Sequence, residues 1–254
     1  AAIWQNGQSP LLRYSQSLAD KIQQKLQDQY VVELAMRYGR PDVKTALAKF
    51  AALGINDIIL LSLYPQYSRT TTETNIDYVK RLALPGQKID VIKDYHDHPA
   101  YIEALANQIK AAWRQQSRAD QLLFSFHGLP KASIGQGDPY YHQCLKTAKL
   151  LAKALDLSES DYGVSFQSRV GRAEWLTPYT DQTIVKMAQQ GVRSLDVFCP
   201  GFSIDCLETL EEIDIQNRAG FLDNGGKHFR YIAALNDRDQ HVDMLAAIVE
   251  EPKL

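Results

Sequence analysis

A single histidine stands at the end of a strongly apolar run. His127 directly follows residues 122–126 (LLFSF) and precedes Gly128 and Pro130. The run predicts a buried strand, and the glycine and proline predict that the chain leaves the sheet there, so the imidazole should lie at a sheet edge. A neutral imidazole, with an ordinary pKa of about 6.5, binds a borderline divalent metal or accepts a proton at pH 7. The alternative is a histidine whose ring is satisfied by hydrogen bonds to the neighbouring backbone.

Three acidic residues further along share a helical spacing. Asp205, Glu208 and Glu212 are placed i, i+3 and i+7, which at about 100° per residue puts them on one stripe of a helix. Their mutual repulsion has to be opposed by a cation, a proton or a helix N-terminus. A helix N-terminus alone favours the first two by ~0.3–1 kcal/mol each but does not account for Glu212, a turn later. The stripe therefore indicates a functional role, whereas Glu211 and Asp214 fall on other faces and are expected to be solvated.

Aromatic residues and arginines gather near the ends of the predicted strands. The aromatic residues are Tyr38, Tyr64, Tyr67, Trp175, Tyr179 and Phe202, and the arginines near them are Arg37, Arg69, Arg169 and Arg172. Any one of these rings is more simply explained as part of the core. Together they fit a slot for a flat apolar ligand that carries carboxylates.

The elements that must position these residues alternate along the chain. Helical apolar periods are followed by short β-branched or aromatic runs, which is typical of βαβ units with parallel sheets. The expected fold class is α/β, with two similar domains at residues 1–117 and 118–236 and a closing helix, residues 237–254, packed across them. In open parallel sheets ligands bind at the carboxyl ends of the strands, where the residues above are predicted to lie.

Local signals give the bounds of these elements. Strands are expected at residues 30–36, 57–63, 88–93, 121–126, 162–167, 194–198 and 228–232. Pro41, as a first helical residue, predicts a helix that runs to Phe50, and the S/T-x-x-E pattern from Thr70 to Glu73 predicts the start of another. The acidic stripe is assigned to a helix over residues 205–218.

Composition and charge exclude several classes of protein. The 254 residues include 28 Lys+Arg and 30 Asp+Glu, so no basic field holds a polyphosphate backbone and nucleic acid is not an expected partner. Three scattered cysteines, Cys144, Cys199 and Cys206, argue against a disulfide framework and indicate a reducing cytoplasm. The longest apolar stretch, residues 58–61, is far too short to span a membrane, although peripheral contact with one stays open. Fingerprints for nucleotides and for a hydrolase serine are missing from the sequence.

Several short motifs together resemble the ferrochelatase family, in content and in order. They are RYGRP at 37–41, YPQYS at 64–68, SFHGLP at 125–130, GDPY at 137–140, FQSRVG at 166–171, WLTP at 175–178, PGFS at 200–203 and DCLETL at 205–210. The resemblance covers nearly the whole chain. Each motif is weak alone, whereas the combination is specific.

The resemblance implies a fold and a reaction. It implies two Rossmann-like domains, each with a four-stranded parallel sheet, and a porphyrin cleft between them in which ferrous iron is inserted into protoporphyrin IX to form protoheme. By motif, His127 and Glu208 resemble the pair that handles metal and protons, and Asp205 and Glu212 resemble a proton or metal path leading away from it. The expected substrate-binding residues are Arg37, Tyr38, Tyr64, Gln66, Tyr67, Ser68 and Trp175.

The resemblance also sets expectations about cofactors. Ferrous iron is expected as a substrate, no cofactor is expected to be permanently bound, and three scattered cysteines predict no iron–sulfur cluster. Cys206 stands where animal members have histidine, and the family's usual first strand and the loop after it are expected to be missing before Ala1. Two rivals remain: a chelatase for cobalt or a smaller substrate, which should offer a second histidine in the cleft, and a tetrapyrrole carrier, which would not need both His127 and Glu208.

Overall fold

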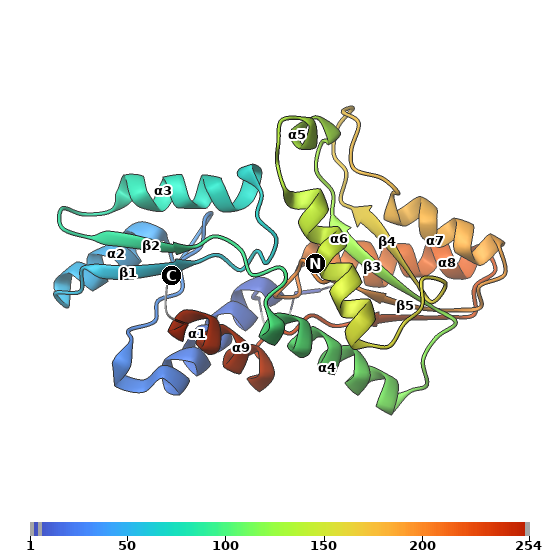
Figure 1. The fold of residues 1–254 in the computed structure, drawn as a ribbon, viewed down its shortest axis with the longest axis horizontal. Coiled ribbons are helices and arrows are strands. Elements are labelled where there is room, and N and C mark those ends of the chain that lie inside the picture. The colour runs from blue at the N-terminus through green and yellow to red at the C-terminus, as the bar shows by residue number, and fades with distance from the viewer. Residues whose placement is uncertain (1–2, 5–6, 252–254) are drawn as a thin grey trace.

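Two parallel sheets of unequal size organise the chain. The computed structural model describes residues 3–4 and 7–251 (Figure 1). The larger sheet has the strand order β4-β3-β5-β6, made of β3 (Gln121–His127), β4 (Tyr162–Gln167), β5 (Ser194–Phe198) and β6 (His228–Ile232). The smaller sheet pairs β1 (Asp57–Leu61) with β2 (Lys88–Ile92) in parallel. The predicted α/β class is confirmed. Among the described residues the first half has two paired strands, whereas three were predicted there once the family's first strand was taken to be missing.

The predicted strand at residues 30–36 is wrong. Within the part of the chain that the structure describes, its ladder pairing is limited to one bridge, from Met36 to Asp42. Its polar backbone groups turn instead to α1 (Pro10–Leu26): the Gln23 amide donates to the carbonyl of Tyr30, and its oxygen accepts from the backbone N–H of Val32. The composition suits a strand, but a strand forms only beside a neighbour that pairs with it.

Two helix starts in the first half also differ from the prediction. Helix α2 (Val43–Ala52) begins two residues after Pro41, because the Asp42 carboxylate accepts from the backbone N–H of Thr45 at 2.8 Å and caps the helix there. The second helix begins within a residue of the predicted start, with a π-helical turn, η2 (Arg69–Glu73), that leads into α3 (Thr74–Leu82). Its cap is Ser68 rather than Thr70, since the Ser68 hydroxyl accepts from the Thr70 N–H.

The remaining helices cover the sheets and join the two halves. They are η1 (Gln27–Gln29), α4 (Pro99–Gln115), α5 (Lys131–Gly135), α6 (Tyr140–Ala154), α7 (Thr180–Gln189), η3 (Glu208–Asn217), α8 (Arg218–Asp223) and α9 (Asp239–Glu250). Helix α9 packs against α1 and α4, and α4 also packs against α6 (Figure 1). One buried cluster accordingly runs from Leu18 through Leu105 to Phe124 and Leu245. Among the described residues, none of the helices is both long enough and apolar enough to cross a bilayer.

Candidate active site

His127 lies at the last position of β3, as predicted. Its half-buried ring is oriented by Nδ1, which donates to the carbonyl of Gly128 at 2.6 Å. A neutral imidazole carries one proton, so a proton on Nδ1 leaves the lone pair on Nε2. The backbone contact thus fixes the ring and leaves a nitrogen that can accept a proton or bind a metal.

Two aromatic rings flank His127. The centroid of its ring lies 6.5 Å from that of Trp175 and 6.3 Å from that of Phe202. Trp175 is held by its Nε1–H, which donates to the carbonyl of Val170 at 3.0 Å. Gly128 makes this packing feasible, because a Cβ there would sit 2.9 Å from the Gln167 carbonyl oxygen and 3.1 Å from Cε3 of Trp175. The motif glycine is therefore required by close approach rather than by an unusual backbone angle.

Two of the three acidic residues share one helix as predicted, and the third lies outside it. Glu208 and Glu212 are four residues apart on η3, whose π-helical hydrogen bonds run i→i+5, so they lie within about one turn of each other. Asp205 precedes the helix and is 3% exposed. Its carboxylate is held by buried donors: the hydroxyl of Tyr231 at 2.6 Å, the amide of Asn236 at 2.7 Å and the hydroxyl of Thr209 at 3.1 Å. These bonds fix the start of the helix that carries Glu208.

Glu212 is tied to the end of β4. Its carboxylate accepts from the backbone N–H of Ser168 at 2.7 Å and from the Ser168 hydroxyl. Ser168 follows the last residue of β4 with φ +62°, a left-handed conformation that is unusual for serine and points both donors at the carboxylate. Two donors to one carboxylate hold Glu212 in place, four residues after Glu208 on η3.

Gln167 is the residue at this site whose role the sequence did not reveal. It pairs with His127 across β3 and β4 and is 3% exposed. Its amide nitrogen donates to the carbonyl of Glu208 at 2.8 Å, and its amide oxygen accepts from the hydroxyl of Ser125 at 2.7 Å and from Sγ of Cys199. One side chain therefore joins the ends of three strands to the residue that carries the candidate base. A polar residue closing a buried strand was the available signal.

Tyr64 brings the first half of the chain to Glu208. Partial burial raises the pKa of the Tyr64 phenol, and the neighbouring Glu208, Cys206 and Tyr38 raise it further. Burial, followed by Glu208, likewise raises the pKa of the Cys206 thiol, so both groups stay protonated at neutral pH. A neutral phenol and a neutral thiol thus lie near the Glu208 carboxylate.

The other residues of the 64–68 segment hold the two halves together. Gln66 and Ser68 are buried, with the Gln66 amide donating to the Thr147 hydroxyl at 3.0 Å and the Ser68 hydroxyl donating to Asp138 at 2.8 Å. The Tyr67 hydroxyl donates to Glu73 at 2.6 Å. Burial, with this bond, raises the pKa of Tyr67 to about 12. Gln66 and Ser68 therefore face α6 and its N-terminal loop, and position Tyr64 beside them.

Arg37 and Tyr38 lie in the loop before α2. The Arg37 guanidinium carbon lies 4.0 Å from the centroid of the Tyr78 ring and 5.0 Å from that of Tyr38. Tyr38 is 82% exposed, which is unusual for an aromatic side chain and leaves one face of the ring open. The sequence-predicted residues thus form two groups, one around His127 and Trp175 and one around Tyr64 and Glu208, which Gln167 connects.

The architecture matches solved structures of metal chelatases. One is CbiX, the terminal enzyme for siroheme biosynthesis in denitrifying bacteria, with a TM-score of 0.62 at 13% identity over 95% of this chain and 92% of that one. Another is the sirohydrochlorin chelatase SirB from Bacillus subtilis subspecies spizizenii in complex with cobalt, with a TM-score of 0.60 at 10% identity over 91% and 86% of the two chains. At these identities the likeness concerns the fold, which is the chelatase fold.

Sequence similarity narrows that class. Residues 1–253 match the family model described as ferrochelatase. The ferrochelatase of Alcanivorax borkumensis is 46% identical over 259 residues, covering 98% of this chain and 75% of that protein. The chain belongs to the ferrochelatase family, the lyases of heme biosynthesis that insert iron into protoporphyrin IX.

Proposed function

We propose that His127 and Glu208 carry out the insertion of ferrous iron into protoporphyrin IX. The observation that supports this most is the Gln167 link, which places a histidine with a free Nε2 and a half-buried carboxylate on neighbouring elements of one rigid sheet end. Insertion replaces two pyrrole N–H protons with Fe²⁺, so the site must remove two protons and admit one dication. A neutral imidazole and an ionised carboxylate together supply those capacities.

The aromatic residues would hold the macrocycle. Trp175 and Phe202 flank His127, while Tyr64 and Tyr38 approach from the first half, so a flat ring can be gripped from both sides. Binding energy at the edges of the ring can then offset the cost of bending a pyrrole nitrogen out of plane. Arg37 suits a propionate carboxylate, Tyr67 borders the same loop, and Gln66 and Ser68 support that loop from behind.

Protons would leave along η3. Glu212 lies four residues after Glu208 on this helix, and the donors of Ser168 keep its carboxylate fixed. Asp205 contributes by anchoring the start of the helix through its buried hydrogen bonds. Iron itself is a substrate and must be released to the ring, so a site with few strong ligands suits the reaction better than a closed cage.

The same proposal covers cofactors, partners and compartment. Cys144, Cys199 and Cys206 are free thiols on different elements, which suits a reducing cytoplasm and does not supply the four ligands of an iron–sulfur cluster. The near balance of acidic and basic residues does not favour nucleic-acid binding. The partners are the porphyrin and ferrous iron. Peripheral contact with a membrane would give an apolar porphyrin a route to the protein.

An anaerobic assay with Fe²⁺ tests the proposal. The full chain is offered protoporphyrin IX or the more carboxylated coproporphyrin, and metalloporphyrin formation is followed by absorbance. We expect the wild-type chain to insert Fe²⁺ into protoporphyrin IX and the variant His127→Ala to lose this activity. If the wild-type chain binds either porphyrin but inserts Fe²⁺ into neither, the protein is a tetrapyrrole carrier instead.

A further inference from the structure

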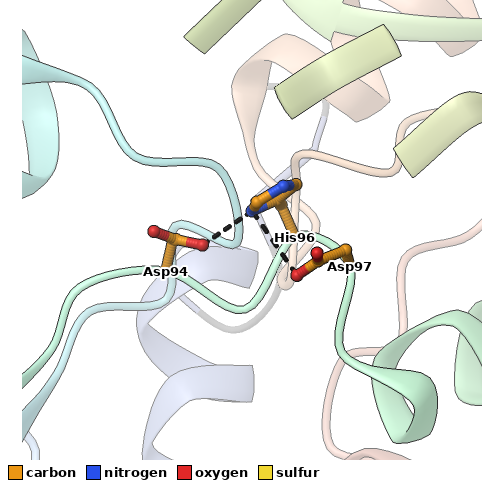
Figure 2. A group of neighbouring side chains, drawn as sticks. All are labelled: Asp94, His96 and Asp97. Atoms are coloured by element: carbon orange, nitrogen blue, oxygen red, sulfur yellow. Dashed lines mark hydrogen bonds and ion pairs between the residues drawn. The ribbon is translucent and has the colours of Figure 1, made fainter. Parts of the chain in front are cut away.

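A second group of metal-ligating side chains lies away from His127 and Glu208. Asp94, His96 and Asp97 occupy the loop between β2 and α4, and each offers one ligand atom within 4.8 Å of the others. Figure 2 shows the His96 ring between the two carboxylates, with one ring nitrogen facing both. His96 is 9% exposed, whereas the two aspartates are partly open to solvent.

The distances suit an ion that is bound by three protein ligands. Nδ1 of His96 lies 2.6 Å from Oδ1 of Asp94 and 3.8 Å from Oδ1 of Asp97. Ligand atoms about 2.1 Å from a divalent metal lie roughly 3.0–3.4 Å from each other in octahedral or tetrahedral geometry. The two measured distances, 2.6 Å and 3.8 Å, lie on either side of this range. A small rotation of the Asp94 side chain would break its hydrogen bond to His96 and make room for the ion between them.

The charges around the group favour a dication. Lys146, on α6, donates from Nζ to Oδ2 of Asp97 at 2.5 Å and leaves Oδ1 facing His96. This bond lowers the pKa of Asp97, which therefore stays ionised. With a neutral imidazole, two carboxylates and one ammonium, the group carries a net charge of about −1. An imidazolium held between the two aspartates is the competing explanation, and it would require no metal.

We propose that Asp94, His96 and Asp97 form a binding site for a divalent cation of the borderline class, such as Zn²⁺, Co²⁺ or Fe²⁺. One imidazole nitrogen and two carboxylate oxygens are ligands that these ions accept, whereas Ca²⁺ and Mg²⁺ take oxygen ligands. The exposed sides of Asp94 and Asp97 leave the remaining coordination positions to water.

The position of the site gives it a structural consequence. The carbonyl of His96 accepts from the Thr147 hydroxyl at 2.7 Å, and the same hydroxyl accepts from the Gln66 amide at 3.0 Å. An ion at this site would therefore fix the loop after β2 to α6 and, through Thr147, to the segment that carries Tyr64.

Titration with Zn²⁺ alone tests this site without porphyrin. The parent for this test is the full chain with His127→Ala and Glu208→Gln, which lacks the candidate insertion pair. Calorimetry then counts the Zn²⁺ sites that remain in this parent. We expect one equivalent, together with a Zn²⁺-dependent rise in Tm. Adding His96→Asn should weaken that binding by about tenfold or more and abolish the rise in Tm.

Two further variants keep the test decisive. Asp94→Asn replaces a partly exposed ligand with little change of shape, so it should fold with an unchanged metal-free Tm and still lose the Zn²⁺ effect. His142→Asn changes an exposed histidine on α6 and should bind Zn²⁺ like its parent. An absence of Zn²⁺ binding in the parent, or equal binding in all of these variants, would show that the cluster is an ion pair of imidazolium with carboxylates.

Discussion

At the scale of single residues, one backbone contact orients the ring of His127. The 2.6 Å bond from Nδ1 to the Gly128 carbonyl selects the tautomer and leaves Nε2 unprotonated. Trp175 and Phe202 restrict the ring further. The imidazole is therefore oriented before any substrate binds, which is the arrangement that proton transfer requires.

Replacing His127 by alanine should separate chemistry from binding. We expect insertion of Fe²⁺ to fall by ~10²–10⁴-fold, the range for loss of a general base, because Nε2 is removed. Porphyrin affinity, measured by absorbance titration, should change by only a few fold because the aromatic walls remain. Turnover at the wild-type rate would refute the assignment.

Glu208 should be far more important than its neighbour Glu211. The change Glu208→Gln keeps the size and removes the charge, so we expect about a 10²-fold or greater loss in kcat for insertion. Glu211→Gln, on the same π-helical segment, is the matched control and should cost less than a factor of two or three. Equal small losses at both positions would mean that the acidic run is only a solvated face.

At the scale of elements, the Gln167 side chain connects the ends of the strands to η3 through hydrogen bonds. Gln167→Leu preserves volume but leaves the Glu208 carbonyl and the Ser125 hydroxyl with fewer partners, at about 1–3 kcal/mol for each buried group that loses its bond. We expect a lower free energy of unfolding in urea and a fall in kcat, because Glu208 loses its position.

Gln121→Leu is the control for that change. Gln121 lies at the opposite end of β3, where its amide donates to the Ser160 carbonyl in an exposed setting. Its loss should cost less than ~1 kcal/mol and leave kcat unchanged. A Gln167→Leu variant that unfolds and turns over like this control would show that Gln167 is not needed to position Glu208.

The smaller sheet should be the less protected of the two. Among the described residues β1 is paired in a ladder only with β2, whereas β3 lies between β4 and β5. Amides of β1 should therefore exchange with solvent faster than those of β3, because fewer strand bonds must break to open them. Hydrogen exchange followed by mass spectrometry reads both strands in one experiment, and equal protection would contradict the expectation.

Sequence reasoning succeeded where a signal was local. The apolar run and the glycine after it located His127 at the end of β3, and the motif order identified the family. It failed where the outcome depended on distant partners. Residues 30–36 have strand composition but lack a ladder neighbour. Asp205 precedes η3, and its carboxylate is bound by Tyr231 and Asn236, which are distant in the sequence.

At the scale of the whole molecule, His241 makes stability depend on pH. Nδ1 donates to the Asn236 carbonyl, Nε2 has no partner among the described residues, and burial lowers the pKa of His241 to about 4. Unfolding returns this pKa to about 6.5, so the unfolded chain binds the proton first. The contribution of neutral His241 to the free energy of unfolding is therefore complete above pH 6.5 and is lost as the pH falls from 6.5 to 4. The total loss is on the order of 3 kcal/mol.

Urea denaturation between pH 7.5 and pH 4.5 measures this contribution. His241→Gln should flatten the pH dependence of the free energy of unfolding, although it is expected to be less stable at neutral pH. His142→Gln, at an exposed position, should retain the slope of the wild type. A slope that His241→Gln leaves unchanged would assign the acid sensitivity to other groups.

The three thiols also bear on the metal that the enzyme handles. Burial raises the pKa of Cys144, Cys199 and Cys206, so at neutral pH each is kept as a protonated thiol. Soft and borderline metals coordinate the thiolate, not the thiol. In a member of the ferrochelatase family, whose substrate is ferrous iron, these three thiols are therefore poor ligands for that ion. Mercury or cadmium could bind one of these cysteines only after its thiol lost a proton, and burial of the thiol makes that deprotonation unfavourable at neutral pH.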